Sequence, residues 1–327
     1  TGAGIAAVAG SRGGVLLATT VAGNRTSGGV EQDCNFVAAI PTLTSLGGNV
    51  IGDHTCLQSD PTDLKGPLAQ GYWLNGTDGG IYNFGTGFFG SVPGVGVHVN
   101  NIVGMARAPD NQGYWLVGND GAVYSFGSAT FFGSLPGVGI HVTNIVGITA
   151  TPDGKGYWLV GNDGGVFSFG DATFFGSVPG AGVSVSNVVG IAHTPDGNGY
   201  WVVGNDGGVY AFGNAGYFGS VPGVNVHVTN IKGIAPTTDG TGYYVVGADG
   251  GLYAFPSGGA SNGYFGSVPG VNVHVNNIVA MAAMPDQAGY WIFGNDGGVF
   301  AFPDAPFRGS VPGVNVHVNN VVGAAGT

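Results

Sequence analysis

A fifteen-residue motif recurs six times along most of the chain, and its spacing is the strongest constraint on the fold. One copy reads GYWLVGNDGGVFSFG, from Gly156 to Gly170. The tyrosines of successive copies are separated by 42, 43, 43, 43 and 47 residues. A period of about 40–45 residues is typical of one blade of a β-propeller. The repeated tyrosines are Tyr72, Tyr114, Tyr157, Tyr200, Tyr243 and Tyr290.

Each repeat is predicted to hold four short strands. In one copy these are Asn144–Ala150, Gly156–Gly161, Val166–Phe169 and Thr173–Val178. A Pro-Asp-Gly turn follows the first strand, and an Asn-Asp-Gly-Gly turn follows the second. The Tyr-Trp-Leu-Val run of the second strand is apolar at every position, so both of its faces need cover. Packing between two neighbouring blades provides that cover.

The two ends of the repeat region are incomplete in complementary ways. Residues 71–92 contain the second to fourth strands of a blade, with nothing like Asn-Ile-Val-Gly before them. Residues 319–326 read as a first strand with nothing after it. We therefore predict an all-β, six-bladed propeller over residues 66–327, closed by the C-terminal strand beside 71–92. Closure removes the exposed strand edges that an open array would leave.

The repeated strands also predict how the blades pack. The first strand alternates small residues, as in Ile145-Val-Gly-Ile-Thr149, which suits strands crowded around an axis. A large aromatic residue recurs in the second strand, and each such ring can bury ~150–250 Å². These rings are expected to dominate the contacts between blades. They are Trp73, Trp115, Trp158, Trp201, Tyr244 and Trp291.

Residues 1–65 lack the period and form a separate β-rich N-terminal segment in this interpretation. They contain the two cysteines, Cys34 and Cys56. An isolated pair favours a disulfide in an oxidising compartment, with two buried thiols as the alternative. Asn24 and Asn75 begin glycosylation sequons, which are common by chance in such a chain.

Two resemblances extend this picture. The run from Asn24 to Cys34, the run LTSLGGNVIGD before Cys56, and the later Asp60-Pro61 and Gly66-Pro-Leu68 resemble the closing rungs of secreted bacterial right-handed β-helix proteins. That resemblance implies a short β-helix-like or strand-donating segment that ends around a cysteine pair. The unit GYWLVGNDGGVFSFG followed by Phe-Phe-Gly-Ser resembles tandem repeats of secreted and cell-surface bacterial proteins. It implies an extracellular or cell-surface propeller and no particular activity.

Composition excludes several classes of function. Lys and Arg number only 7 against 18 acidic residues, so no basic stripe is available for nucleic acid. No apolar run reaches the ~18–20 residues of a membrane span. Phosphate-binding loops, cysteine clusters, HExxH and G-x-S-x-G motifs are missing from the sequence. We therefore expect no enzymatic activity, no cofactor and no metal.

Histidine recurs with the blades, each time inside a Val/Ile-His-Val run just before a first strand. Five imidazoles would then ring one mouth of the channel as a metal or anion site. The spacing argues against a shared ion, because Zn–N bonds are only ~2.0–2.1 Å long. The alternative, which we favour, is a structural histidine bonded to backbone in each blade. The residues are His98, His141, His227, His274 and His317.

Two sets of aspartates recur in turn positions, and we assign them to turn chemistry rather than to catalysis. A glycosidase needs two acids singled out ~5–9.5 Å apart, and none stands out from the repeat. The first set is Asp78, Asp120, Asp163, Asp206, Asp249 and Asp296, and the second is Asp110, Asp153, Asp196, Asp239 and Asp286.

Three cationic or titratable residues depart from the repeat. Arg107 and His193 stand near the end of the first strand, where other copies have alanine or proline, and Lys232 replaces a valine. They are candidates for lining the channel and binding an anion. Drift at solvated positions is the plainer interpretation, and we prefer it.

The favoured hypothesis for function is an extracellular structural protein. A Gly-rich, charge-poor chain with an incomplete β segment is suited to form a homo-oligomer, or a filament, sheath or surface layer, through that segment and the propeller. The alternative is a cell-surface propeller that binds carbohydrate or another surface ligand at the disc face.

Overall fold

The computed structural model describes residues 15–16, 20–21, 43–45, 50–51, 57–58, 64–65, 70–256 and 263–327. The chain divides into two compact units, Thr1–Gly71 and Tyr72–Thr327. Cys34, Cys56 and Asn24 lie outside the described residues.

The first unit contains short strands that pair in parallel. Alternate strands join two three-stranded sheets, in the orders β1-β3-β5 and β2-β4-β6. Stacking of alternate strands in parallel is the arrangement of a β-helix-like segment. The strands are β1 (Val15–Leu16), β2 (Thr20–Val21), β3 (Leu43–Ser45), β4 (Val50–Ile51), β5 (Leu57–Gln58) and β6 (Leu64–Lys65).

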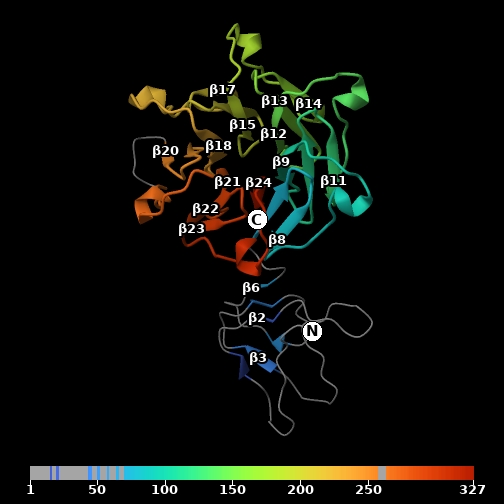
Figure 1. The fold of residues 1–327 in the computed structure, drawn as a ribbon, viewed down its shortest axis with the longest axis vertical. Coiled ribbons are helices and arrows are strands. Elements are labelled where there is room, and N and C mark those ends of the chain that lie inside the picture. Colours follow the sequence, from blue (N-terminus) through green and yellow to red (C-terminus); the bar gives the residue numbers. More distant parts are fainter. Residues whose placement is uncertain are drawn as a thin grey trace. The chain divides into compact units, whose positions relative to one another are not determined.

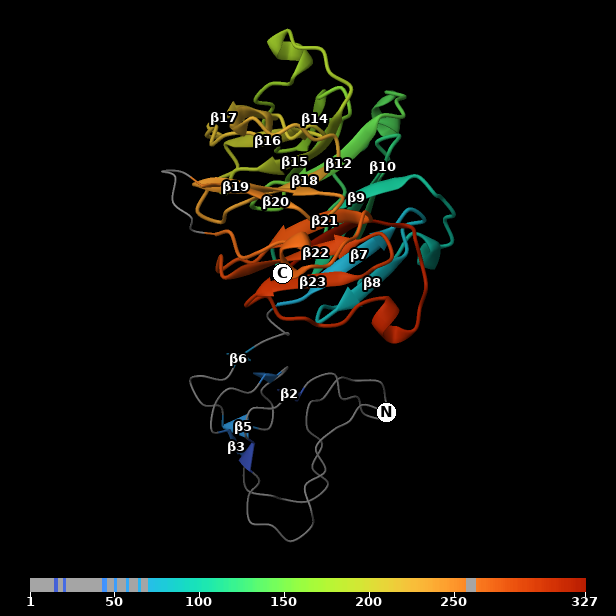
Figure 2. The same ribbon diagram turned by 60° about the vertical axis from the view of Figure 1, so that its left-hand side comes forward.

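The second unit is a six-bladed β-propeller built from six antiparallel three-stranded sheets (Figures 1 and 2). The inner, middle and outer strands of five blades are β9 (Ile102–Arg107), β10 (Gly113–Gly118) and β11 (Val123–Gly127); β12 (Ile145–Ala150), β13 (Gly156–Gly161) and β14 (Val166–Gly170); β15 (Val188–His193), β16 (Gly199–Gly204) and β17 (Val209–Gly213); β18 (Ile231–Pro236), β19 (Gly242–Gly247) and β20 (Leu252–Pro256); and β21 (Ile278–Ala283), β22 (Gly289–Gly294) and β23 (Val299–Pro303).

The sixth blade joins the two ends of the propeller, as the sequence predicted. Its strands are β24 (Val321–Gly326), β7 (Tyr72–Gly76) and β8 (Ile81–Phe84). β24 pairs antiparallel with β7, with Ala324 opposite Leu74. Strand β24 thus takes the inner position that β9 or β12 holds elsewhere. The closed ring leaves no inner-strand edge without a neighbouring blade.

The expected fourth strand is wrong. Thr173–Val178 belongs to a loop that ends in a 3-10 turn, η3 (Pro179–Ala181). The N–H of Phe175 and the C=O of Gly176 are bonded to the hydroxyl of Tyr200 in the next blade, so they do not join a strand ladder. The same turn recurs as η1 (Pro93–Val95), η2 (Pro136–Val138), η4 (Pro222–Val224), η6 (Pro269–Val271) and η7 (Pro312–Val314).

At every boundary between blades, a large aromatic ring of one middle strand packs against the tyrosine of the next. Trp158 is fully buried and its ring centroid lies 5.7 Å from that of Tyr200 in the next blade. The blade of β22 contacts the sixth blade in the same way, with Trp291 and Tyr72 5.6 Å apart. The repeated large aromatics are thus buried in the contacts between blades, where each large ring contributes much apolar area. The other pairs are Trp73–Tyr114, Trp115–Tyr157, Trp201–Tyr243 and Tyr244–Tyr290.

The small residues of the inner strands lie where the blades approach the axis. A Cβ added to Gly323 would lie 3.3 Å from the Cα of Gly104 on the adjacent inner strand. It would also lie 2.5 Å from Oδ1 of Asn75. These distances leave no room for a larger side chain at Gly323. Among the described residues, no helix is long and apolar enough to cross a membrane.

Candidate functional site

The repeated aspartates have the turn role that the sequence predicted. In the Asn-Asp-Gly-Gly turn, Oδ1 of Asp163 accepts a hydrogen bond from the N–H of Gly165 at 3.0 Å. In the other turn, Oδ1 of Asp153 accepts from the N–H of Lys155 at 3.1 Å. The equivalent bonds recur in every copy of both turns. These carboxylates are therefore committed to backbone geometry.

Asp153 illustrates the electrostatics of these turns. Its pKa is lowered to about 2 by the hydrogen bond from the Thr151 hydroxyl, with further help from the backbone and side chain of Lys155. Lys155 Nζ lies 3.1 Å from Asp153 Oδ2. A carboxylate held ionised in this way is a poor general acid at neutral pH.

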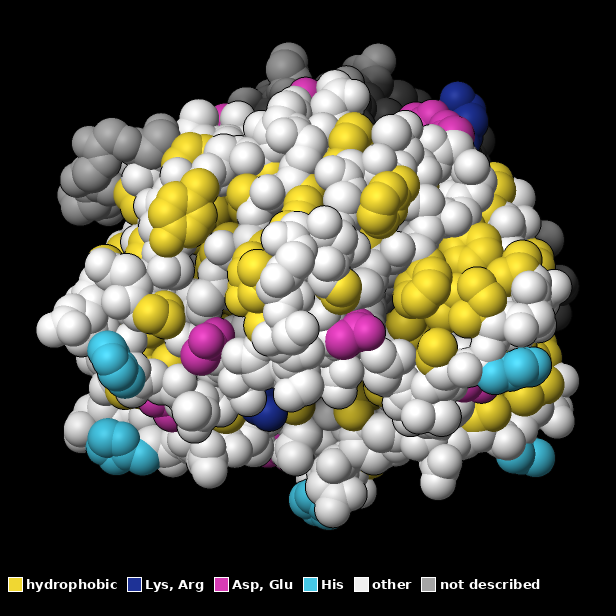
Figure 3. All heavy atoms as spheres, turned by 90° about the horizontal axis from the view of Figure 1, so that it is seen from above, with side chains coloured by type: hydrophobic (Ala, Val, Ile, Leu, Met, Phe, Trp, Pro, Cys, Tyr) yellow, Lys and Arg dark blue, Asp and Glu magenta, His cyan; other side chains and the backbone are white. Residues whose placement is uncertain are grey.

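The five repeated histidines do not form a site. All five are exposed, and the histidine side chains visible in Figure 3 stand apart from one another. No hydrogen bond joins His98, His141, His227, His274 or His317 to another described residue, so the favoured structural role is wrong as well. Within the ranges that the structure describes, no group of His, Cys, Asp or Glu is placed to hold a metal ion.

The sequon at Asn75 is also excluded from the surface of the folded propeller. Asn75 lies in the middle of the blade on β7 and has no exposed area. Its Oδ1 is buried without a hydrogen-bond partner among the described residues. The other blades have Val117, Val160, Val203, Val246 or Phe293 at this position.

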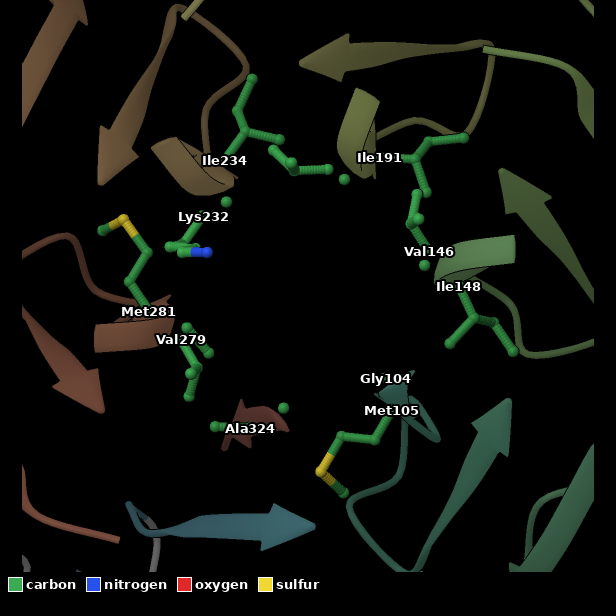
Figure 4. A pocket seen from close by; sticks show the side chains of 16 residues that line it. Gly104, Met105, Val146, Ile148, Ile191, Lys232, Ile234, Val279, Met281 and Ala324 are labelled. Atoms are coloured by element: carbon green, nitrogen blue, oxygen red, sulfur yellow. The ribbon is translucent and has the colours of Figure 1, made fainter. Parts of the chain in front are cut away.

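The central channel is narrow and mostly apolar. A cavity of about 130 Å³ is lined by all six inner strands. Figure 4 shows Lys232 reaching into it beside Ile234 and Met281. Lys232 therefore lines the channel, which was the less favoured of the two interpretations, and its side chain is exposed. The remaining labelled side chains are aliphatic or thioether groups, which offer an ion no second ligand.

Arg107 and His193 line a different and larger cavity. It measures about 420 Å³ and lies at the ends of β9, β12 and β15, in the turns that follow them. It shares only Met105 and Ile148 with the channel cavity. The three residues that depart from the repeat are thus divided, with Lys232 in one cavity and Arg107 and His193 together in the other.

The hydrogen bonds of the larger cavity orient both side chains. Arg107 Nη1 donates to Oδ1 of Asn111 at 2.7 Å. His193 Nδ1 lies 2.8 Å from the carbonyl oxygen of Thr194, so Nδ1 carries the proton. Burial lowers the pKa of Arg107 and of His193, and the charge of Arg107 lowers that of His193 further. His193 is therefore neutral at pH 7, and its Nε2 is an acceptor.

Sequence reasoning missed the most extensive surface feature, which lies in the loops that join each outer strand to the next inner strand. We call these segments the rim loops; they are 85–101, 128–144, 171–187, 214–230, 263–277 and 304–320. Each rim loop contains one 3-10 turn, and the turns lie at the outer edge of the disc (Figure 1).

Every large exposed hydrophobic side chain of the described residues lies in a rim loop. Each loop has one aromatic ring that is 49–60% exposed, and Figure 3 shows several separate hydrophobic patches. In one loop the Tyr217 hydroxyl donates to Ser220 Oγ at 3.0 Å, so the ring lies against the 3-10 turn. The rings are Phe88, Phe131, Phe174, Tyr217, Tyr264 and Phe307, with Val95, Val97, Val138, Ile140, Val183, Val224, Val226, Val271, Val273, Val314 and Val316 around them.

The repeat contained a signal for this surface. The first residue of the Phe-Phe-Gly-Ser run, Phe174 in one copy, is aromatic in all six copies, as is the second in most. The second, Phe175, packs against Tyr200 with ring centroids 5.7 Å apart. Only one of two adjacent aromatics faces that neighbour. The sequence could not show which one, because loop residues have no fixed alternation.

Comparisons with known proteins leave the function open. No protein-family model matches the chain, and no curated protein matches it in sequence. Among solved structures, it is similar to one described as the crystal structure of the Myceliophteria thermophila Cps50 (Swd1) beta-propeller domain. The identity is 14% and the TM-score is 0.43, over 62% of this chain and 66% of that one. The chain thus spans slightly less than two thirds of that domain, and similarity at this level says nothing about activity.

Proposed function

We propose that this chain is an extracellular structural protein that assembles with copies of itself, through its rim loops and its N-terminal β segment. The single observation behind this proposal is the placement of the exposed hydrophobic side chains. On most monomeric proteins such side chains are scattered, whereas larger apolar patches mark sites of association. Here they recur six times, in equivalent loops around one disc.

The chemistry of the rim loops supports another copy of this chain as the occupant. The loops carry aromatic and aliphatic side chains with histidine, asparagine and serine, and only a few scattered acidic and basic residues. A partner of opposite charge has little to recognise there. The same apolar patch on a second copy is complementary in character, and six patches on each molecule allow more than one neighbour. Contacts that do not close on themselves build filaments or layers.

The N-terminal unit offers a second route to assembly. The outer strands are β1 and β5 in one of its parallel sheets, and β2 and β6 in the other. Among the described residues, no further strand pairs with these edges. An unpaired parallel edge is a template for another chain. This route accommodates the strand-donating role expected from the sequence.

The test is the assembly state of the full chain. Sedimentation velocity and electron microscopy should show species larger than the monomer. A variant in which the six exposed rim aromatics are replaced by serine should shift toward monomer, because each serine removes an exposed ring. The matched control replaces the five rim histidines with glutamine, which changes exposed residues of the same loops without removing apolar area. A wild-type chain that is strictly monomeric at all concentrations overturns the proposal.

One observation favours carbohydrate or surface binding as a second candidate. An exposed aromatic ring beside a serine hydroxyl, as with Tyr264 and Ser267, can stack on an apolar sugar face. Here the loops rather than the disc face would be the binding element. A glycan array separates the two candidates, because specific glycan binding by a monomer favours this one. Silence on the array, together with assembly, favours the structural role.

A further inference from the structure

The cavity at the ends of β9, β12 and β15 departs from the symmetry of the propeller. Arg107 and His193 occupy equivalent positions in two blades on either side of a third, where Ala150 stands. The corresponding residues elsewhere are Pro236, Ala283 and Gly326. Each departure introduces a basic side chain, and both side chains line the same cavity. Independent drift at two solvated surface positions gives no reason for both side chains to lie in one cavity.

Neither side chain is paired with a carboxylate in the described part of the chain. The hydrogen-bond partner of Arg107 is the neutral amide of Asn111, and that of His193 is the Thr194 carbonyl. The eleven lining residues include no acid, and apart from Arg107 and His193 they are Met, Ala, Pro, Ile and Thr. A largely buried guanidinium without a counter-charge is costly, and an anion offsets that cost.

The neighbouring acids are already engaged. Asp196 follows His193 in the same turn, and it accepts hydrogen bonds from Thr194, Asn198 and Asn214. Asp110, in the turn after β9, accepts from the N–H of Gln112 and the hydroxyl of Ser128. Asp153, in the turn after β12, accepts from the Thr151 hydroxyl and the N–H of Lys155. None of these three lines the cavity.

We propose that this cavity binds a small organic molecule with one carboxylate and an apolar body. The guanidinium of Arg107, held by Asn111, receives the carboxylate, since Arg matches the geometry of that group. The proline and isoleucine side chains of the cavity wall cover the apolar body, and about 420 Å³ is in the usual range for small ligands. When the anion binds, His193 Nε2 takes up a proton, and the resulting N–H donates a hydrogen bond to a carboxylate oxygen.

The experiment uses benzoate as the probe, with benzamide as its neutral isostere and inorganic phosphate as a different oxyanion. Isothermal titration of the full chain should show one benzoate per chain and at least about tenfold weaker binding of benzamide. The imidazole signals of His193 should shift on titration. Binding should strengthen as the pH falls from 8 to 6, with proton uptake, because benzoate stays ionised while His193 gains a proton.

Two substitutions and one control complete the test. Arg107→Ala and His193→Ala each install the residue that the cavity already has at position 150, so folding should be preserved. Arg107→Ala should weaken benzoate binding at least about tenfold, the loss expected for a hydrogen-bonded charge pair. His193→Ala should abolish the pH dependence. Lys155→Ala removes an exposed cation of the same kind of turn and should leave binding unchanged.

Several results would overturn this inference. Equal binding of benzoate and benzamide would show that the cavity recognises the apolar ring and not the carboxylate. Undiminished binding by Arg107→Ala, or loss of binding in Lys155→Ala to the same extent, would assign the anion to another place. Binding of phosphate without benzoate would refute the ligand class. No binding of any probe at millimolar concentration would refute the site.

Discussion

The tyrosine hydroxyls of the middle strands should contribute a measurable share of the contact between blades. Tyr200 lies in one blade, and its hydroxyl donates to the Gly176 carbonyl of the preceding blade at 2.6 Å. The same oxygen accepts from the N–H of Phe175 at 3.2 Å. Tyr72 makes the equivalent bonds to Gly309 and Arg308, so it links the sixth blade to the blade of β22. Tyr200→Phe removes only the hydroxyl and keeps the packed ring.

The expected loss follows from counting bonds. Each net hydrogen bond is worth about 1 kcal/mol, and two partly buried backbone groups of the rim loop lose their partner. We therefore expect Tyr200→Phe to lower the free energy of unfolding by about 2 kcal/mol. For a domain of this size that corresponds to a fall in Tm of about 4–8 °C. Tyr72→Phe should cost about the same, because its bonds of 2.6 and 3.0 Å are equivalent.

Chemical denaturation followed by tryptophan fluorescence measures both variants, since the buried tryptophans contact these tyrosines. Tyr210→Phe is the matched control. Tyr210 lies on the outer strand β17, and the equivalent residue of another blade is Phe167. Our reasoning about the hydroxyls is refuted if Tyr200→Phe and Tyr210→Phe unfold within about 0.5 kcal/mol of each other. If Tyr200→Phe lowers the free energy of unfolding as expected and Tyr72→Phe does not, the contact that closes the ring is not equivalent to the others.

Three further predictions concern stability. Asn75→Val should raise the free energy of unfolding by about 1–2 kcal/mol in a urea titration, because it removes a buried oxygen without a partner and installs the residue of other blades; unchanged or lower stability would contradict this. Burial raises the pKa of the middle-strand tyrosines above that of the unfolded chain, to about 12 for Tyr243. As the pH rises, the unfolded chain therefore loses its tyrosine protons before the folded chain does. The free energy of unfolding should be constant below pH 10 and fall between pH 10 and 12, with a smaller fall in Tyr243→Phe. Parallel pH curves for the wild type and Tyr243→Phe would disprove the assignment. Gly164→Ala should lower Tm by several degrees, since φ is +75° and its Cβ would lie 2.6 Å from Val178, and an unaltered Tm would show that the turn can relax.

Much of the architecture could be predicted from the residues alone. The 43-residue period predicted the blades, and Asp163 followed by two glycines predicted a tight turn. The missing first strand before residue 71 and the extra strand at the C-terminus predicted how β24 pairs with β7. These features depend on local backbone chemistry and on counting. Both can be taken directly from the amino-acid sequence.

The fourth strand and the repeated histidines show where this reasoning fails. Thr173–Val178 has a strand-like composition, but the N–H of Phe175 and the C=O of Gly176 bond to the Tyr200 hydroxyl of the next blade. His141 and its equivalents were expected to face a channel mouth, whereas the rim loops place them in solvent. Both outcomes depend on contacts between blades, which a single repeat does not encode.

The sequence by itself determined that the chain makes six similar β units and closes them into a ring, because the period, the turn residues and the complementary partial repeats at the two ends can be identified along the chain. Only the tertiary structure decided which of two adjacent aromatics faces solvent in each rim loop, and that Arg107 and His193 share a cavity while Lys232 does not. The physical reason is that the curvature of the ring, and not distance along the chain, brings side chains of separate blades together.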